Sequence, residues 1–281
     1  MLDNAPRALI TGGGSGLGRA LALRLARRNA RLLIADIHLE RAEETVALAR
    51  QRGARAEAIR CDVSKLEDLE AAARKIDELY GGIDLLVNNA GVAVAGPVGD
   101  LPIEDWDWIL RTNLWGPIYG CHVFVPRMKA QRSGYILNVA SSAGFASLPE
   151  MGAYNVTKAG VIALSETLDA ELAPYGIKVS VLCPTFFKTN LLETLRATTD
   201  EQRASAQAMF DRASMTADEV AEAALRGLER GELIIIPQLD GKLVWRAKRF
   251  GPELYRKVIR QRALIELLSP ANKTKPKPST A

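Results

Sequence analysis

Short runs of β-branched and aliphatic residues alternate with longer amphipathic stretches along most of this chain, and this alternation constrains the fold most strongly. The predicted strands are Ala8–Thr11, Arg31–Asp36, Ala54–Cys61, Leu85–Asn88, Gly134–Ala140, Lys178–Cys183 and Leu233–Ile236. The helical patterns between them are Gly16–Arg28, Leu39–Arg52, Lys65–Tyr80, Ile103–Lys129, Tyr154–Ala173 and Ala217–Arg230. Right-handed crossovers join such elements into one doubly wound parallel sheet with helices on both faces.

The chain divides by charge into a body, residues 1–239, and a C-terminal extension, residues 240–281. The extension has 11 Lys/Arg and 3 Asp/Glu, which leaves 26 and 30 for the body. Apolar residues three and four apart predict helices in this tail, broken near Gly251-Pro252. The tail either docks on its own domain or on a sister subunit, which we favour, or lies on an anionic membrane. Its end, Lys273–Ala281, is predicted to be disordered.

Several classes of protein are not expected. Cys61, Cys121 and Cys183 each lie in or beside an apolar run and suit buried reduced thiols, so we expect a cytoplasmic location, with peripheral membrane contact as an alternative. No apolar run approaches the ~20 residues that span a bilayer, and Met1–Pro6 is too short and polar for a signal peptide. His38 has no partner at metal-ligand spacing, and nor has the other histidine, so no metal is predicted. Nucleic-acid binding is not expected either, because the basic charge is confined to the tail.

A glycine-rich segment, Thr11–Gly18, follows the first predicted strand, and a helix opens there. Glycine lets the backbone turn sharply and approach a pyrophosphate, while free N–H groups and the helix dipole favour the anion. A plain turn also uses glycine, but strand, loop and helix occur in the order that a Rossmann-type nucleotide site requires. The predicted contacts are Gly12, Gly14, Ser15, Gly16, Leu17 and Gly18.

Asp36 ends the second predicted strand, eighteen residues beyond Gly18. A carboxylate there accepts hydrogen bonds from the adenosine ribose and repels a 2′-phosphate. Ser15 is neutral and Ile37 follows the acid, so the usual cationic partners of NADP are missing. NAD is therefore the preferred cofactor over NADP, and Arg41 is the nearby cation that opposes this argument.

Two further predicted strand ends carry polar or small residues where an open parallel sheet places its ligand crevice. Asp62-Val63 follows the third strand, and Asp62 either accepts from the adenine amino group or caps the next helix, for which Ser64 is the better candidate. Asn88–Gly91 follows the fourth strand; Gly91 permits close approach to the adenosine, and the asparagines alternatively tie strands together. The expected cofactor contacts are Asp62, Val63, Asn89, Ala90 and Gly91.

Together these residues resemble the short-chain dehydrogenase/reductase family from about Arg7 to Pro237. The motifs are TGGGSGLG at Thr11–Gly18, NNAG at Asn88–Gly91, Ser141, and YNVTK at Tyr154–Lys158. The resemblance implies a catalytic set of Asn113, Ser141, Tyr154 and Lys158, of which Tyr154 and Lys158 also bind the cofactor. The family serine precedes the tyrosine by thirteen residues, which selects Ser141, with Ser142 as the alternative if the loop is registered differently.

The implied reaction removes a hydroxyl proton while hydride passes to a nicotinamide. A free tyrosine, with a pKa of ~10, is a poor base near neutrality. Tyr154 and Lys158 are four apart on a predicted helix and share a face. The ammonium and the oxidised nicotinamide both favour phenolate, so the pKa of Tyr154 is expected to fall. Ser141 would hold the substrate oxygen, and Asn113 either holds a relay water or merely satisfies backbone in a bent helix.

The family's segment after the sixth strand matches Pro184–Thr189, with Thr185 where glycine is usual. Thr189 is expected to bind the nicotinamide carboxamide, and Pro184 and the backbone of Phe187 to contact the cofactor. The change at Thr185 leaves the path of the loop open.

The substrate pocket is expected to be mostly apolar, without a cation for a carboxylate or phosphate. Its predicted lining is Val92, Val94, Phe145, Leu148, Met151, Phe186 and a variable lid, Asn190–Phe210. This predicts a hydrophobic secondary alcohol or ketone, unless these side chains are ordinary core.

The sequence as a whole predicts an NAD-dependent oxidoreductase. The family resemblance implies a homodimer or homotetramer formed through the long helices around Asn113 and Tyr154–Ala173. The alternative is a non-catalytic dinucleotide-binding regulatory or scaffold protein, against which the intact set of Ser141, Tyr154 and Lys158 argues.

Overall fold

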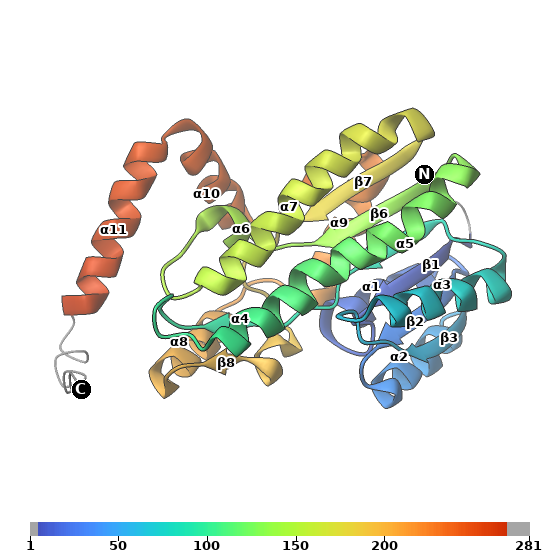
Figure 1. Ribbon diagram of the computed structural model, residues 1–281, viewed down its shortest axis with the longest axis horizontal. Coiled ribbons are helices and arrows are strands. Elements are labelled where there is room, and N and C mark those ends of the chain that lie inside the picture. Colours follow the sequence, from blue (N-terminus) through green and yellow to red (C-terminus); the bar gives the residue numbers. More distant parts are fainter. Residues whose placement is uncertain (1–4, 269–281) are drawn as a thin grey trace.

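A computed structural model describes residues 5–268, with side chains through residue 261. Seven parallel strands form the main sheet in the order β3-β2-β1-β4-β6-β7-β9, which confirms the predicted doubly wound Rossmann-type fold (Figure 1). The strands are β1 (Arg7–Thr11), β2 (Arg31–Asp36), β3 (Arg55–Arg60), β4 (Leu85–Asn88), β6 (Gly134–Val139), β7 (Ile177–Leu182) and β9 (Ile234–Ile235).

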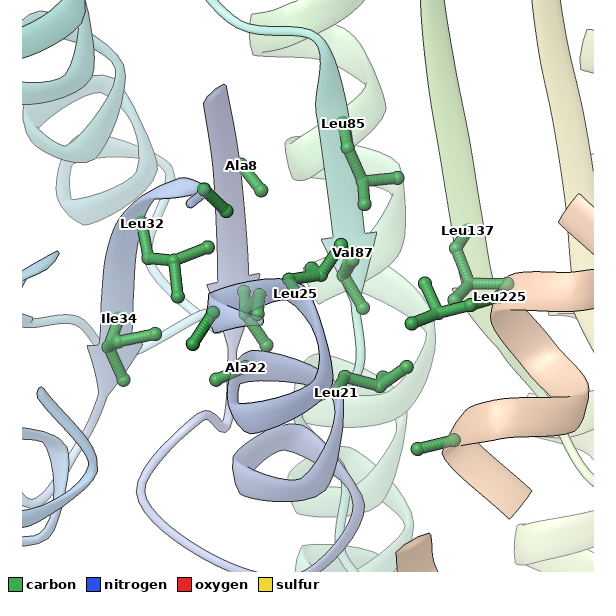
Figure 2. Close-up of a cluster of buried hydrophobic side chains, with 14 of the residues drawn as sticks. Ala8, Leu21, Ala22, Leu25, Leu32, Ile34, Leu85, Val87, Leu137 and Leu225 are labelled. Carbon is green, nitrogen blue, oxygen red and sulfur yellow. The ribbon is translucent and has the colours of Figure 1, made fainter. Parts of the chain in front are cut away.

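Helices cover both faces of the sheet. The helices on one face are α1 (Gly16–Ala26), α2 (Leu39–Gln51) and α9 (Ala217–Arg230). Those on the other are α3 (Leu66–Tyr80), α5 (Gly116–Gln131) and α7 (Gly152–Leu172). The central strands are buried on both faces and therefore read as continuous apolar runs. The hydrophobic core on the face covered by α1, α2 and α9 is called the first core. Figure 2 shows this core, where Leu21 and Leu25 of α1 and Leu225 of α9 pack against the sheet.

The predicted helix Ile103–Lys129 is interrupted by a π-helical turn. It consists of α4 (Ile103–Leu110), the turn η1 (Arg111–Trp115) and α5. A π-helical turn widens the helix locally and is often found at functional sites. Asn113 lies in this turn and is completely buried.

The lid segment has regular structure of its own. It contains the short helix η3 (Asn190–Thr194), the strand β8 (Arg196–Ala197) and the helix α8 (Asp200–Asp211). β8 pairs in parallel with β5 (Val94–Ala95), which follows β4. The lid is thereby hydrogen-bonded to the main domain beside the carboxyl end of β4.

The tail forms two helices, α10 (Leu239–Phe250) and α11 (Pro252–Leu268), and the predicted break at Gly251-Pro252 is confirmed. α10 lies beside the short helix α6 (Ala143–Ala146), and α11 lies beyond α10 at the edge of the molecule (Figure 1). Lys248 Nζ donates to Ser147 Oγ at 3.0 Å, and the Tyr255 hydroxyl donates to the Ala146 carbonyl at 2.6 Å. The tail thus contacts its own domain, and the predicted disordered end at 273–281 lies outside the described residues. Across residues 5–268, no helix is both long and apolar enough to cross a membrane.

Candidate active site

A cavity of about 670 Å³ lies at the carboxyl ends of the parallel strands. It falls within the usual range of ligand pockets, about 300–1,000 Å³. Its walls come from the glycine-rich loop, the ends of β2, β3, β4 and β6, the start of α7 and the lid. This is the crevice in which an open doubly wound sheet binds its ligand.

The glycine-rich loop has no room for side chains at two turning points. Gly12 has a φ of +61°, and a Cβ there would lie 2.8 Å from the Ala90 Cα. Gly16 has a φ of +48°, and a Cβ there would lie 2.7 Å from Thr189 Oγ1. Both dihedral angles are in the left-handed region that favours glycine. The loop therefore brings bare backbone against the β4 loop and the lid, a cradle that fits a pyrophosphate.

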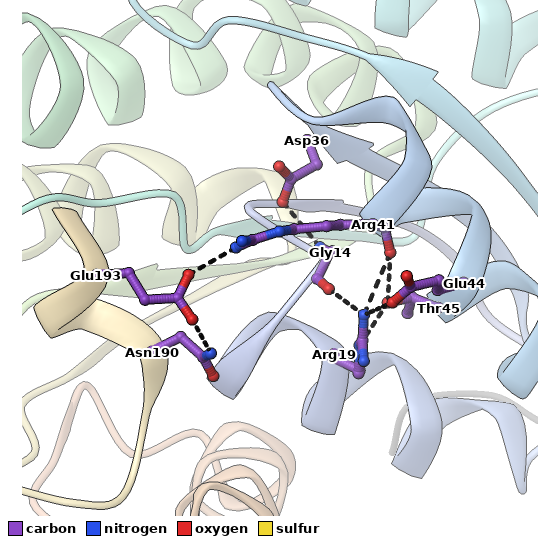
Figure 3. A network of polar contacts seen from close by, with 8 residues as sticks. All are labelled: Gly14, Arg19, Asp36, Arg41, Glu44, Thr45, Asn190 and Glu193. Carbon is purple, nitrogen blue, oxygen red and sulfur yellow. Dashed lines mark hydrogen bonds and ion pairs between the residues drawn. The ribbon is translucent and has the colours of Figure 1, made fainter.

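Asp36 is held in place by the backbone. Its Oδ2 accepts from Gly14 N at 2.8 Å and its Oδ1 accepts from His38 N at 3.0 Å. The carboxylate lines the cavity and is 9% exposed. It is thus pre-positioned beside the loop, where the sequence predicts a ribose-binding acid (Figure 3).

Asp62 and Val63 also line the cavity. Asp62 Oδ1 accepts from Ser64 N at 3.0 Å and from Ser64 Oγ at 2.7 Å. The cap position of α3 belongs to Lys65, without a side-chain cap, so the expectation of Ser64 as the cap is wrong. The reason is that the hydroxyl of Ser64 is already engaged by Asp62.

The asparagines at the end of β4 mainly tie strands together. Asn89 Nδ2 donates to the carbonyl of Thr11 at 2.8 Å, and Asn88 Nδ2 donates to Asn138 Oδ1 at 2.8 Å. A Cβ at Gly91 would lie 3.3 Å from Asn113 Oδ1 and 3.6 Å from Lys158 Nζ. The β4 loop therefore connects the glycine-rich loop to the predicted catalytic groups, and Asn89, Ala90 and Gly91 line the cavity.

Tyr154, Ser141 and Lys158 converge on the cavity. The Tyr154 hydroxyl hydrogen-bonds the Ser141 side chain. Lys158 Nζ lies 5.6 Å from the centroid of the Tyr154 ring and donates to the Val139 carbonyl at 2.9 Å. Ser141 Oγ accepts from Ala143 N at 3.1 Å and donates to the Pro184 carbonyl at 3.4 Å, which fixes the hydroxyl between the β6 and β7 loops.

Burial shifts the pKa values of both ionisable groups against their charged forms. Tyr154 is 8% exposed and Lys158 is 4% exposed. Burial raises the pKa of Tyr154 to about 12, which its hydrogen bond with Ser141 partly opposes. Burial lowers the pKa of Lys158 to about 8. In the protein alone the pKa of Tyr154 is therefore raised, and the fall expected beside an oxidised nicotinamide stays a prediction.

Asn113 uses its side chain on backbone. Its Oδ1 accepts from Val92 N at 2.8 Å and its Nδ2 donates to the Val92 carbonyl at 2.9 Å. The side chain thus joins the π-helical turn to the backbone of Val92, in the segment after β4, rather than satisfying backbone of its own helix. It does not line the cavity, although it stands next to Lys158 across Gly91.

The segment after β7 runs along the cavity, and Pro184, Phe187 and Thr189 line it. Phe187 also packs against the first core. Thr185 N donates to Gln238 Oε1 at 3.1 Å, and its hydroxyl hydrogen-bonds Asp240 Oδ1 at 3.2 Å. The threonine that replaces the usual glycine therefore ties this loop to the start of α10.

The predicted substrate residues gather as expected with one exception. Val92, Val94, Leu148, Met151 and Phe186 line the cavity together with much of the lid. Phe145 instead packs in a cluster around Val161, so its placement in the pocket is wrong. The ring of Phe186 makes an edge contact with Phe210 of α8, with centroids 5.3 Å apart.

Most of the predicted site residues thus share one cavity. Gly14, Gly18 and Asn113 stand behind its lining. Sequence reasoning missed Ile259 of α11, which lines the cavity, and the Thr11 hydroxyl, which accepts from Asn89 N and Ala90 N at 3.0 and 3.1 Å. The position of Thr11 at the end of β1 was the available signal; no local signal points to Ile259.

The model of the short chain dehydrogenase family matches residues 6–200. This chain therefore belongs to the short-chain dehydrogenase family. The match covers the glycine-rich loop, the β4 loop, Ser141 and the Tyr154 helix, which are the parts that build the cavity.

Relatives of known sequence and structure agree with this assignment. The probable oxidoreductase EphD of Mycobacterium bovis is 33% identical over 264 residues, which are 91% of this chain and 45% of that protein. This chain thus spans about half the length of that curated relative.

Two solved structures resemble nearly the whole chain. A short chain dehydrogenase/reductase from Burkholderia phymatum, in complex with NAD, has a TM-score of 0.81 and 29% identity and covers 100% of this chain and 99% of its own. A short-chain dehydrogenase from Sphingobium yanoikuyae, in complex with NADPH, has a TM-score of 0.74 and 29% identity and covers 98% of both chains.

Proposed function

We propose that this protein is an NAD-dependent dehydrogenase/reductase of hydrophobic secondary alcohols or ketones, with Tyr154 as the general acid/base. The observation that carries the proposal is the convergence of Tyr154, Ser141 and Lys158 on a cavity that begins at the glycine-rich loop. A protein that only bound a dinucleotide would have no need of this buried set. The non-catalytic alternative is therefore the less favoured one.

The residues present fit a nicotinamide dinucleotide. Gly12 and Gly16 leave a cradle that a Cβ would fill, and Asp36 is fixed beside it by two backbone N–H groups. The other groups proposed to hold the cofactor are Asp62, Val63, Asn89, Ala90, Gly91, Pro184, Phe187 and Thr189. NAD is preferred because Asp36 repels a 2′-phosphate. When bound, the dinucleotide supplies or accepts the hydride.

Tyr154 is proposed to exchange the proton with the substrate oxygen. Ser141, whose side chain hydrogen-bonds the phenol, is proposed to hold that oxygen. The protein alone raises the pKa of Tyr154 to about 12, so the phenolate needs positive charge beside it. Lys158 supplies one such charge, and an oxidised nicotinamide, when bound, would supply the other. Asn113, which adjoins Lys158, is proposed to stand on the proton relay to solvent through its π-helical turn.

The substrate class follows from the cavity wall. Val94, Leu148, Met151, Phe186 and Phe210 line it, so binding removes apolar surface from water. The decisive experiment is a panel of alcohols and ketones followed at the absorbance of the reduced nicotinamide, with NAD and NADP compared. Turnover restricted to small charged substrates would contradict the substrate class, and dinucleotide binding without any turnover would support the scaffold alternative.

We also propose a homodimer or homotetramer formed through the helices around Asn113 and α7. Trp115 and Val156 are 47% and 50% exposed on these helices, and a subunit contact there would remove their apolar surface from water. Light scattering of the purified protein tests this, and a monomer would contradict it. A cytoplasmic location is proposed because Cys61, Cys121 and Cys183 are free and buried.

For the tail, which we propose to begin at residue 240, the contacts of Lys248 and Tyr255 with the α6 region favour docking on the protein. The membrane alternative predicts co-sedimentation with anionic vesicles that is lost when the tail is deleted. Unchanged co-sedimentation after deletion, or no binding at all, would end that alternative.

A further inference from the structure

An ion pair joins the lid to α2 at the adenosine end of the cavity. Arg41 Nη1 of α2 lies 2.8 Å from Glu193 Oε2 of η3, although 152 residues separate them in the chain. Asn190 Nδ2 donates to the other carboxylate oxygen of Glu193 and fixes its orientation (Figure 3). Both Arg41 and Glu193 line the cavity.

Arg41 lies where a 2′-phosphate would need a cation. A Cβ added to Gly14 would lie 2.8 Å both from Arg41 Cβ and from Asp36 Oδ2, so the base of this side chain adjoins the proposed ribose-binding acid. Of the other cavity-lining cations, Arg111 lies in the π-helical turn and Lys158 lies beside Tyr154. Arg19 is the other arginine near the loop, and its guanidinium is engaged by Glu44 at 2.9 Å.

We propose that Glu193 is a cofactor-selecting residue, because it holds the Arg41 guanidinium away from a 2′-phosphate and adds a second negative charge to the side of Asp36. Arginine binds phosphate through two parallel hydrogen bonds, which need a free face of the guanidinium. The ion pair occupies Nη1 of that group and offsets its positive charge. The inference rests on the proposed NAD preference, which it attributes to Glu193 of the lid as well as to Asp36.

The pair serves selectivity rather than stability. The side chains of Arg41 and Glu193 are 45% and 43% exposed, and such exposed pairs stabilise a fold by little. Removing the carboxylate of Glu193 should therefore leave the fold unchanged. It should instead change the ratio of the dissociation constants of NADPH and NADH, and this change should be larger at low ionic strength.

The experiment measures the dissociation constants of NADH and NADPH by nucleotide fluorescence for the full-length protein. The variants are Glu193→Gln, Arg41→Gln and the two combined. Glu44→Gln is the matched control, because Glu44 is a carboxylate of α2 that pairs with Arg19 rather than Arg41. Glu193→Gln should lower the ratio Kd(NADPH)/Kd(NADH) about 5- to 10-fold, a factor equivalent to one lost charge interaction. Glu44→Gln should change it less than about 2-fold.

Arg41→Gln alone should leave the ratio unchanged or raise it, and the double variant should lose the gain of Glu193→Gln. An unchanged ratio in Glu193→Gln, or a gain that survives in the double variant, would overturn the role of Glu193 while the wild-type preference for NADH stands. A wild-type protein that binds NADPH more tightly would overturn the cofactor assignment itself. A protein that binds neither nucleotide would overturn the proposed function.

Discussion

Replacing Lys158 with methionine should stabilise the protein while abolishing turnover. Burial lowers the pKa of this lysine from 10.5 to about 8, so the folded protein holds the ammonium at a cost. At about 1.4 kcal/mol per pH unit, that cost is about 3 kcal/mol near pH 7. The lost hydrogen bond to the Val139 carbonyl, about 1 kcal/mol, offsets part of the gain. The net increase in the free energy of unfolding is about 2 kcal/mol, or about 4 °C in Tm for a domain of this size.

The pH dependence of the stability difference separates the cost of the buried ammonium from better packing of the methionine. Between pH 8 and 10.5 the unfolded chain binds a proton at Lys158 that the folded protein does not, so wild-type stability rises with pH. The advantage of Lys158→Met should therefore be full at pH 7 and shrink by pH 10. Thermal and urea unfolding at both pH values measure it, with Lys178→Met as an exposed control that should stay within about 0.5 kcal/mol of wild type. A variant less stable than wild type at pH 7, or a difference independent of pH, would refute the reasoning.

Three further changes probe the loop, the cofactor acid and the buried polar groups. Gly18→Ala should lose more than about 2 kcal/mol of stability and most nucleotide binding, because its Cβ would lie 2.2 Å from the Gly12 carbonyl oxygen. Melting curves and NADH fluorescence measure both effects. The control Gly99→Ala, with open space around its Cβ, should be nearly neutral. Asp36→Ala should raise the KM for NAD about 10-fold and that for NADP less, since the carboxylate binds ribose and repels a 2′-phosphate; equal effects on both cofactors would speak against this role. Asn138→Leu should cost about 3 kcal/mol in urea unfolding, because Asn88 Nδ2 would lose its oxygen acceptor in the core and keep only Cys121 Sγ at 3.6 Å. A neutral result would show that the network is dispensable.

Much of the fold was predictable because the sheet is buried on both faces. Each of the predicted strands is present, even β9, which is only Ile234–Ile235. The π-helical turn at Arg111–Trp115 was not predictable, since its residues continue an ordinary helical pattern. The lid elements were missed because β8 has two residues and is stabilised by pairing with a distant segment.

The candidate site was predictable where residues of one motif act together, and less so where distant segments meet. Tyr154 and Lys158 share a helix, so their proximity follows from spacing. Their pKa shifts do not, because spacing says nothing of desolvation. The Arg41–Glu193 pair, the contact of Ile259 with the cavity and the burial of Phe145 elsewhere all depend on tertiary packing.

The central claim is that the Tyr154 phenol transfers the proton that accompanies hydride transfer. Tyr154→Phe removes only the hydroxyl oxygen and keeps the buried ring, which is 8% exposed in the wild-type residue. The fold and the nucleotide site should therefore remain. Turnover of the best substrate should fall at least ~100-fold, the usual contribution of a general acid/base, while the Kd for NADH and the Tm stay within about 2-fold and 2 °C of wild type. Turnover close to that of the wild-type protein would contradict the account.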